Sequence, residues 1–157
     1  MPVTFYKSAD QLPPFEDYDM KGRTYRYLQG EPLFPFGFGL SYTRFTYRLL
    51  TLPKAASAKR EARIQVEVLN AGKLAGEEVV QLYLKRRGEQ AIRSLAGFER
   101  VALRPGEKKI VEFALTPRQL TPPGTVEISV GGKQPGFHGA ADASTTQVLT
   151  GTLTVAP

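Results

Sequence analysis

From residue 43 onward, apolar and polar residues alternate in short segments that are separated by turn residues. In residues 62–69, for example, Ile64, Val66 and Val68 fall on one face of an extended strand, and charged or amide side chains fall on the other. This pattern recurs along the chain and predicts an all-β sandwich. The expected strands, about seven in number, cover residues 43–50, 62–69, 76–85, 95–103, 108–115, 125–130 and 146–155.

Glycine and proline mark the boundaries of these strands. Pro105 and Gly106 form a turn after the strand at 95–103, and a Pro-Pro-Gly run at 122–124 precedes the strand at 125–130. Gly97 falls inside the strand at 95–103, where a glycine is typical of a kink or bulge. Residues 133–145 are small and polar, so we expect a loop that joins the last two strands as neighbours. No segment has a sustained helical period, and no helix is predicted.

The first 42 residues differ from the rest, because they are rich in Pro, Gly, Tyr and Phe and have neither strand nor helix periodicity. The paired Pro13 and Pro14 and the run at 32–39 favour extended backbone. The aromatic side chains in this segment need a surface to cover, since exposing them to water is unfavourable by ~25 cal/mol per Å² of apolar area. We therefore divide the chain into an extended N-terminal arm, residues 1–42, and a sandwich, residues 43–157.

Composition and charge exclude several classes of function. The 21 basic and 15 acidic residues give a formal net charge of +6, but the basic residues are spread along the chain, which favours a solvated surface over a nucleic-acid site. The absence of cysteine and the single histidine exclude disulfides, thiolate chemistry and histidine-cluster metal sites. No window approaches the ~20 apolar residues of a membrane span, and the N-terminus lacks the pattern of a signal peptide. We expect neither a nucleic-acid nor a membrane partner.

The residues that most resemble catalytic groups do not form a catalytic arrangement. Glu77 and Glu78 are adjacent on a predicted strand, so their side chains should point to opposite faces and cannot flank one glycosidic bond. The three acidic residues between 16 and 19 are too few for an oxygen-ligand cation site, and a solvated arm is the simpler interpretation. His138 has no Ser, Cys or Asp at a known motif spacing and is expected on the surface. No catalytic, metal-binding or cofactor-binding residue is predicted.

The aromatic residues of the arm allow two interpretations. Their rings could stack on the apolar faces of sugars, which would make a carbohydrate-binding site. Alternatively they anchor the arm to a protein surface, which their position among Pro and Gly residues favours. The candidate carbohydrate-binding residues are Tyr25, Tyr27, Phe34, Phe36 and Phe38.

Three segments resemble one enzyme family. Residues 30–45 (GEPLFPFGFGLSYTRF) resemble the PLxPFGxGLSYTxF segment that leads into the C-terminal module of glycoside hydrolase family 3 enzymes. Residues 66–84 (VEVLNAGKLAGEEVVQLYL) and 95–115 (LAGFERVALRPGEKKIVEFAL) are similar to the two strand segments that follow in that module. Residues 2–6 and 18–28 look like the end of the preceding α/β sandwich domain, and 130–136 is similar to the xylosidase-like branch.

This resemblance implies an immunoglobulin-like or fibronectin type III-like β-sandwich, in which the arm is a remnant of the preceding domain. It also implies that the family's nucleophile, an Asp in an N-terminal barrel, and its acid/base, usually a Glu in the α/β sandwich domain, have no counterpart here. The chain would then be an excised fragment or a short gene product expressed alone, and a parent enzyme, a β-xylosidase or β-glucosidase, would be periplasmic or secreted.

The expected function is therefore structural. We expect a non-catalytic accessory domain whose partners are the catalytic domains of a family 3 enzyme, stabilised through their shared interface. One alternative is a carbohydrate-binding module for plant cell-wall polysaccharide, and another is a truncated glycosidase with residual or complementing activity. Self-association through the arm is a further expectation, because aromatic residues without a docking surface would leave a large apolar patch.

Overall fold

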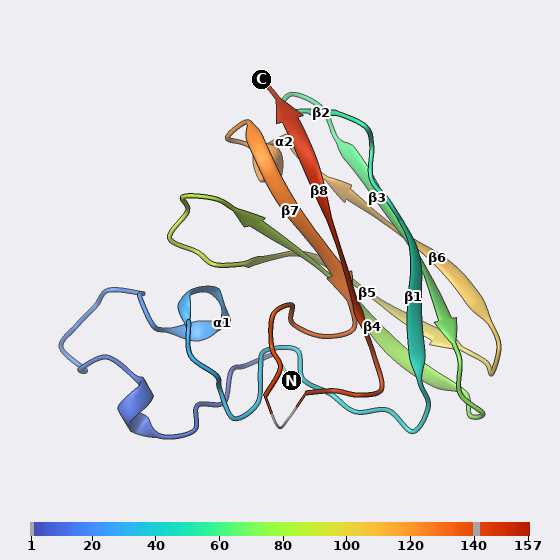
Figure 1. Cartoon of the computed structure of the whole chain (residues 1–157), viewed down its shortest axis with the longest axis horizontal. Coiled ribbons are helices and arrows are strands. Elements are labelled where there is room, and N and C mark those ends of the chain that lie inside the picture. Colours follow the sequence, from blue (N-terminus) through green and yellow to red (C-terminus); the bar gives the residue numbers. More distant parts are fainter. Residues whose placement is uncertain (1, 140–141) are drawn as a thin grey trace.

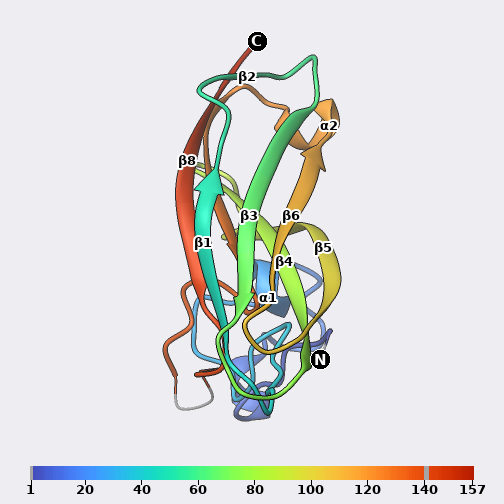
Figure 2. The same ribbon diagram turned by 90° about the vertical axis from the view of Figure 1, so that its right-hand side faces the viewer.

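Two β-sheets pack face to face and enclose one hydrophobic core (Figures 1 and 2). The computed structural model describes residues 2–139 and 142–157. The strands are β1 (Phe45–Thr51), β2 (Ala56–Ser57), β3 (Ala62–Asn70), β4 (Gly76–Arg86), β5 (Ser94–Leu103), β6 (Lys108–Leu115), β7 (Gly124–Gly131) and β8 (Val148–Ala156). The all-β sandwich expected from the alternating pattern is confirmed.

The smaller sheet has the order β1-β3-β6, and the larger has the order β2-β8-β7-β4-β5. Neighbouring strands are antiparallel except for β2, which pairs parallel to the end of β8. The described residues form eight strands where about seven were predicted, because the connection between β1 and β3 adds the two-residue strand β2. Two residues are too few to produce a period, so the sequence pattern could not reveal this strand.

The core lies between the sheets and follows the predicted alternation closely. On β3, Ile64, Val66 and Val68 are each fully buried, and they face Val80 and Leu82 of the larger sheet in the same cluster. Full burial of an aliphatic side chain of this size stabilises the fold by about 1.5–3 kcal/mol. The interior is therefore the main source of stability in the described part of the chain.

The strand β5 contains the irregularity expected at Gly97. Leu82 of β4 pairs with Gly97 but the next residue, Tyr83, pairs with Leu95, so Ala96 is the extra residue of a bulge. A side chain at position 97 would press on the Phe113 ring, whose nearest atom would lie 3.0 Å from a Cβ. The glycine thus allows close approach of the two sheets.

In the described part of the chain, three short helical turns, none of them predicted, lie outside the sheets. They are the 3₁₀ turn η1 (Ala9–Gln11) and the α-helical turns α1 (Thr24–Tyr27) and α2 (Pro117–Leu120). The last one has a capping box, in which the Thr116 hydroxyl accepts from the Gln119 N–H and the Gln119 amide oxygen accepts from the Thr116 N–H at 3.0 Å. Among the described residues, no helix has the length and apolar content to cross a membrane.

Candidate functional site

The arm packs against the larger sheet and against the connection between β4 and β5. Figure 1 shows α1 beside this connection, and backbone and side-chain hydrogen bonds join the two. Ile92 N–H donates to the Arg26 carbonyl oxygen at 2.8 Å, and the Arg93 guanidinium donates to the Tyr25 carbonyl oxygen at 3.0 Å. Leu95 N–H donates to the Tyr25 hydroxyl at 3.2 Å. The arm therefore covers part of the outer face of the sandwich.

Four of the five predicted carbohydrate-binding residues form two pairs of neighbouring rings. Tyr25 and Phe36 are stacked, with ring centroids 4.2 Å apart, and Phe34 and Phe38 lie 5.0 Å apart in a tilted arrangement. Tyr27 belongs to neither pair, and its ring carries the Arg26 guanidinium at 5.6 Å from its centroid. All five side chains are half-buried rather than exposed.

The surface beneath the first pair is Tyr83, a residue that the sequence analysis did not select. Tyr83 is fully buried on the outer face of β4, and its ring lies edge-on to Tyr25 at 6.2 Å between centroids. Burial, and then the neighbouring Tyr25, raises the pKa of the Tyr83 hydroxyl, while the Arg93 guanidinium partly offsets this. The available signal was the mixed pattern of β4, in which both faces carry apolar residues.

Tyr83 begins a chain of hydrogen bonds that reaches the end of β7. Its hydroxyl donates to Gln81 Oε1 at 2.6 Å, and Gln81 Nε2 donates to the Gly132 carbonyl oxygen at 3.2 Å. Gly37 of the arm lies on the Gln81 amide with a φ of +77°, so a side chain here would be strained and would overlap the amide. The arm and the end of β7 are thus connected through one buried amide.

The two adjacent glutamates of β4 lie on opposite faces, as the strand period predicts. Glu77 is exposed and pairs with Arg100 of β5. Glu78 is only 8% exposed, and burial raises the pKa of its carboxyl to about 7, partly offset by the Thr146 hydroxyl and by the Val79 N–H. The two carboxyl groups therefore cannot act on one bond.

The acidic residues of the arm have local structural roles, and His138 lies on the surface. Asp17 Oδ1 accepts from the Asp19 N–H at 2.9 Å, and Asp19 Oδ1 accepts from the Lys21 N–H at 3.1 Å, so these carboxylates stabilise turns of the arm. His138 is exposed. The loop predicted at 133–145 lies partly outside the described residues, at 140–141. Within the described part of the chain, no three acidic or histidine residues are grouped as a metal site.

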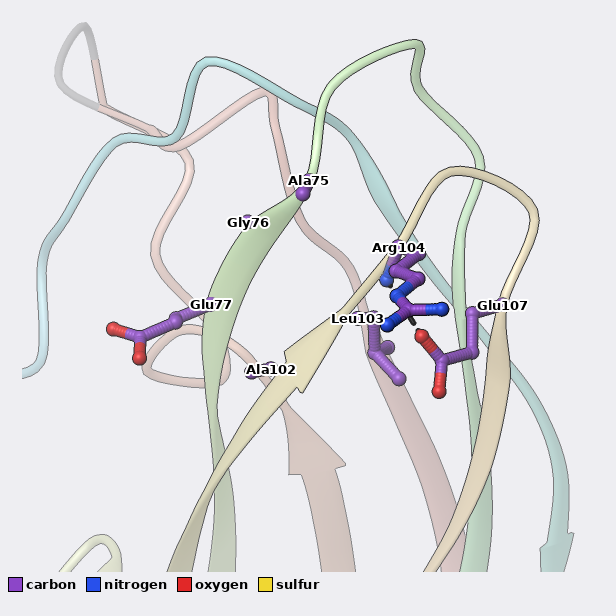
Figure 3. A pocket seen from close by; sticks show the side chains of 7 residues that line it. All are labelled: Ala75, Gly76, Glu77, Ala102, Leu103, Arg104 and Glu107. Carbon is purple, nitrogen blue, oxygen red and sulfur yellow. Dashed lines mark hydrogen bonds between the residues drawn. The ribbon is translucent and has the colours of Figure 1, made fainter.

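Several hollows open on the surface near one end of the sandwich. The one in Figure 3, of about 510 Å³, lies between the start of β4 and the end of β5. There Glu77 points away from Glu107, whose carboxylate instead accepts from the Arg104 N–H at 2.7 Å. The remaining lining is small or apolar, at Ala75, Gly76, Ala102 and Leu103. This hollow therefore contains no pair of facing carboxylates.

Two further hollows involve the arm. A mainly apolar groove of about 280 Å³ lies between the arm and β4 and β5, and its walls include Phe36, Val79, Leu95 and Phe98. We call it the Phe98 groove. A second hollow, of about 500 Å³, lies within the arm itself and brings together Tyr25, Tyr27 and Phe36 of the five predicted residues. Phe34 and Phe38 line neither of these hollows.

A fibronectin type III-like domain model matches residues 78–126. The chain is 40% identical over 142 residues to a xylan 1,4-β-xylosidase of Xylanibacter ruminicola, and this match covers 82% of the chain and 16% of the relative. It is 46% identical over 108 residues to the thermostable β-glucosidase B of Acetivibrio thermocellus, covering 64% of the chain and 13% of the relative.

Solved structures extend the likeness to the arm. The structure of β-glucosidase 3B from Thermotoga neapolitana superimposes with a TM-score of 0.76 at 28% identity, over 99% of this chain and 24% of that protein. The chain thus spans less than a fifth of the two relatives above and about a quarter of this structure. The matched stretch includes both the sandwich and the segment before it.

Proposed function

Because the chain belongs to the fibronectin type III-like domains of glycoside hydrolase family 3, we propose that it is a non-catalytic accessory domain that packs against catalytic domains and stabilises them. The observation that carries this proposal is the Phe98 groove. Phe98 is 68% exposed on β5 and Val79 is 40% exposed on β4, and both side chains line this mainly apolar groove. An apolar patch of this kind marks an interaction surface, because burying it removes apolar area from water.

The arrangement of carboxylates supports a non-catalytic role. Hydrolysis of a glycosidic bond uses two carboxyl groups that face each other across the bond. Here Glu77 is engaged by Arg100, and Glu78 is directed into the sandwich. The chain would therefore contribute interface and rigidity to an enzyme, and other domains would supply the acid and the nucleophile.

A chimera tests this function. In the Xylanibacter ruminicola xylosidase, the matching 142 residues would be replaced by this chain, and compared with the same enzyme from which they are deleted. We expect the chimera to keep a cooperative thermal transition and xylosidase activity, and the deletion to lose both. If the deletion is as stable and as active as the chimera, the proposal is wrong.

Substitutions within the chimera locate the interface. Phe98→Ser should lower the melting temperature of the chimera but not of the isolated chain, because burial of one such side chain contributes about 1.5–3 kcal/mol. Ile110→Ser is the matched control, since Ile110 is 64% exposed on β6 of the other sheet. Equal effects of the two substitutions would contradict a docking role for the Phe98 groove.

A second candidate function is carbohydrate binding, which the hollow within the arm favours. Tyr25, Tyr27 and Phe36 line about 500 Å³ there, and cavities of about 300–1,000 Å³ are typical of small-ligand sites. Isothermal titration with xylo- and cello-oligosaccharides would give saturable heat that Tyr27→Ala abolishes. Phe15→Ala, an exposed ring of the arm outside this hollow, is the control. The same sample should not hydrolyse aryl glycosides, and turnover would contradict the non-catalytic assignment.

A further inference from the structure

A smaller pocket lies beside the Phe98 groove and leads inward to Glu78. The two share Gly37, Val79 and Gln81, so they are neighbours on one surface. The pocket has a volume of about 160 Å³. Its lining comprises residues 37–41 of the arm, Glu77, Glu78, Val79 and Gln81 of β4, and Gly132, Thr145 and Thr146. We call it the Glu78 pocket.

Residues of three different segments lie close to the carboxyl group of Glu78. Val79 N–H donates to Glu78 Oε1 at 2.9 Å. Gly132, at the end of β7, leaves room for the group, because a Cβ there would overlap both carboxyl oxygens and the Thr146 hydroxyl. Tyr47 of β1 faces it from the other sheet, and the pKa of Tyr47 is raised by burial and then by the charge of Glu78. The carboxyl of Glu78 therefore has close neighbours from both sheets.

No cation neutralises this carboxyl within the described residues. The ion pairs there engage other acids, including Glu77 and Glu127, but not Glu78. The Thr146 hydroxyl lies close enough to lower the pKa of Glu78, yet neither it nor the Tyr47 hydroxyl makes a well-formed hydrogen bond to a described residue. A buried carboxylate without a cationic partner is unfavourable, and an ion pair with good geometry relieves that cost.

We propose that the Glu78 pocket receives a lysine or arginine side chain from the catalytic domain that packs on this face. This inference rests on the proposed function and adds a specific contact to it. Leu40 and Val79, both exposed at the pocket, would cover the aliphatic stem of the incoming residue, and Glu78 would pair with its charged head. A charged side chain that fills a pocket surrounded by apolar residues is typical of the residues that contribute most of the binding energy of an interface.

Titration of the isolated chain with butylguanidinium chloride tests the pocket directly. The side-chain carboxyl of Glu78 would be followed by carbon-13 NMR, with tetramethylammonium chloride as the salt control. We expect butylguanidinium to lower the pKa of Glu78 from about 7 to below about 6 and to produce saturable shifts. The accompanying shifts of the Val79 and Gly132 amide signals should be lost in Glu78→Gln and kept in Glu127→Gln, whose carboxyl pairs with Lys85 and does not line the pocket. Equal titration curves in the two salts would overturn the inference.

The chimera supplies an independent test, because the effect of Glu78→Gln on stability should have opposite signs in the isolated chain and in the chimera. Above pH 7, Glu78→Gln should stabilise the isolated chain, because it removes a charge that is buried without a cationic partner. The same substitution should lower the melting temperature of the chimera, because there it breaks the ion pair. If the chimera is folded and active and Glu78→Gln stabilises it too, this inference fails while the accessory function stands. If the chimera does not fold, the accessory function fails and the butylguanidinium titration alone decides the pocket.

Discussion

The buried carboxyl of Glu78 should make the stability of the isolated chain fall as pH rises from 4.5 to about 7. In the unfolded chain this group has an ordinary pKa of 4.5, and in the folded chain burial raises the pKa to about 7. Because the folded pKa is the higher one, the native state holds a proton that the unfolded state has already released. The stabilising contribution is complete below pH 4.5 and is lost as pH rises through about 7.

The size of this effect follows from the two pKa values. A pKa difference of one unit corresponds to about 1.4 kcal/mol, so the change from 4.5 to about 7 amounts to about 3 kcal/mol of unfolding free energy. Glu78 is 8% exposed, so solvent screening reduces this value little. For comparison, a whole domain is stabilised by about 5–15 kcal/mol, so the effect should be easy to measure.

Urea denaturation of the wild-type chain and of Glu78→Gln, followed by circular dichroism between pH 4.5 and 8.5, isolates this group from other titrations. The difference in unfolding free energy between the two proteins should move by about 3 kcal/mol in favour of the variant across that range. Glu77→Gln, an exposed neighbour paired with Arg100, should show a difference within about 1 kcal/mol at every pH. If the Glu78→Gln difference stays constant with pH, the reasoning about its burial is refuted.

Three further substitutions test the contacts of the arm and of the helical turn. Gly37→Ala should lower the unfolding free energy in urea by about 2 kcal/mol or more, because the position has a positive φ and a side chain there would overlap the buried Gln81 amide. Gly88→Ala, at a φ of +86° with open space around it, should lower the unfolding free energy by only about 1 kcal/mol. Equal losses would contradict the contact between Gly37 and Gln81. Tyr83→Phe should cost about 1 kcal/mol in the same assay through the lost hydrogen bond to Gln81, and a neutral result would argue against that bond. Thr116→Ala should cost about 1 kcal/mol through loss of the capping box, whereas Thr116→Ser should be nearly neutral.

The strands could be predicted from the sequence because burial of one face makes apolar and polar residues alternate along each strand. Ile64, Val66 and Val68 alternate with polar residues, and Gly97 marked the bulge of β5. The strand β2 could not be predicted, because its two residues owe their conformation to pairing with the distant end of β8. The turn α2 likewise depends on a local cap rather than on a period.

The surface on which the arm packs was only partly predictable. The number of aromatic residues indicated that the arm needs a surface, but nothing in their spacing identified Tyr83 of the same chain as that surface. Similarly, alternation separates Glu77 from Glu78, yet the burial of Glu78 depends on Gly132 and Thr146, which come from other strands and connections. Self-association through the arm stays a prediction, and the exposed aromatic rings of the arm are those of Phe5, Phe15, Tyr18 and Tyr42.

The small strand β2 has a consequence for how this domain behaves in a crowded solution. Ala56 and Ser57 pair with Val155 and Ala156 at the end of β8, and Ala58 N–H donates to the Ala156 carbonyl oxygen at 2.8 Å. A sheet edge left open offers its backbone to strands of other molecules, which is one route to aggregation. By pairing with Val155 and Ala156, this connection covers the end of the β8 edge, so that a strand of another molecule cannot pair with those two residues.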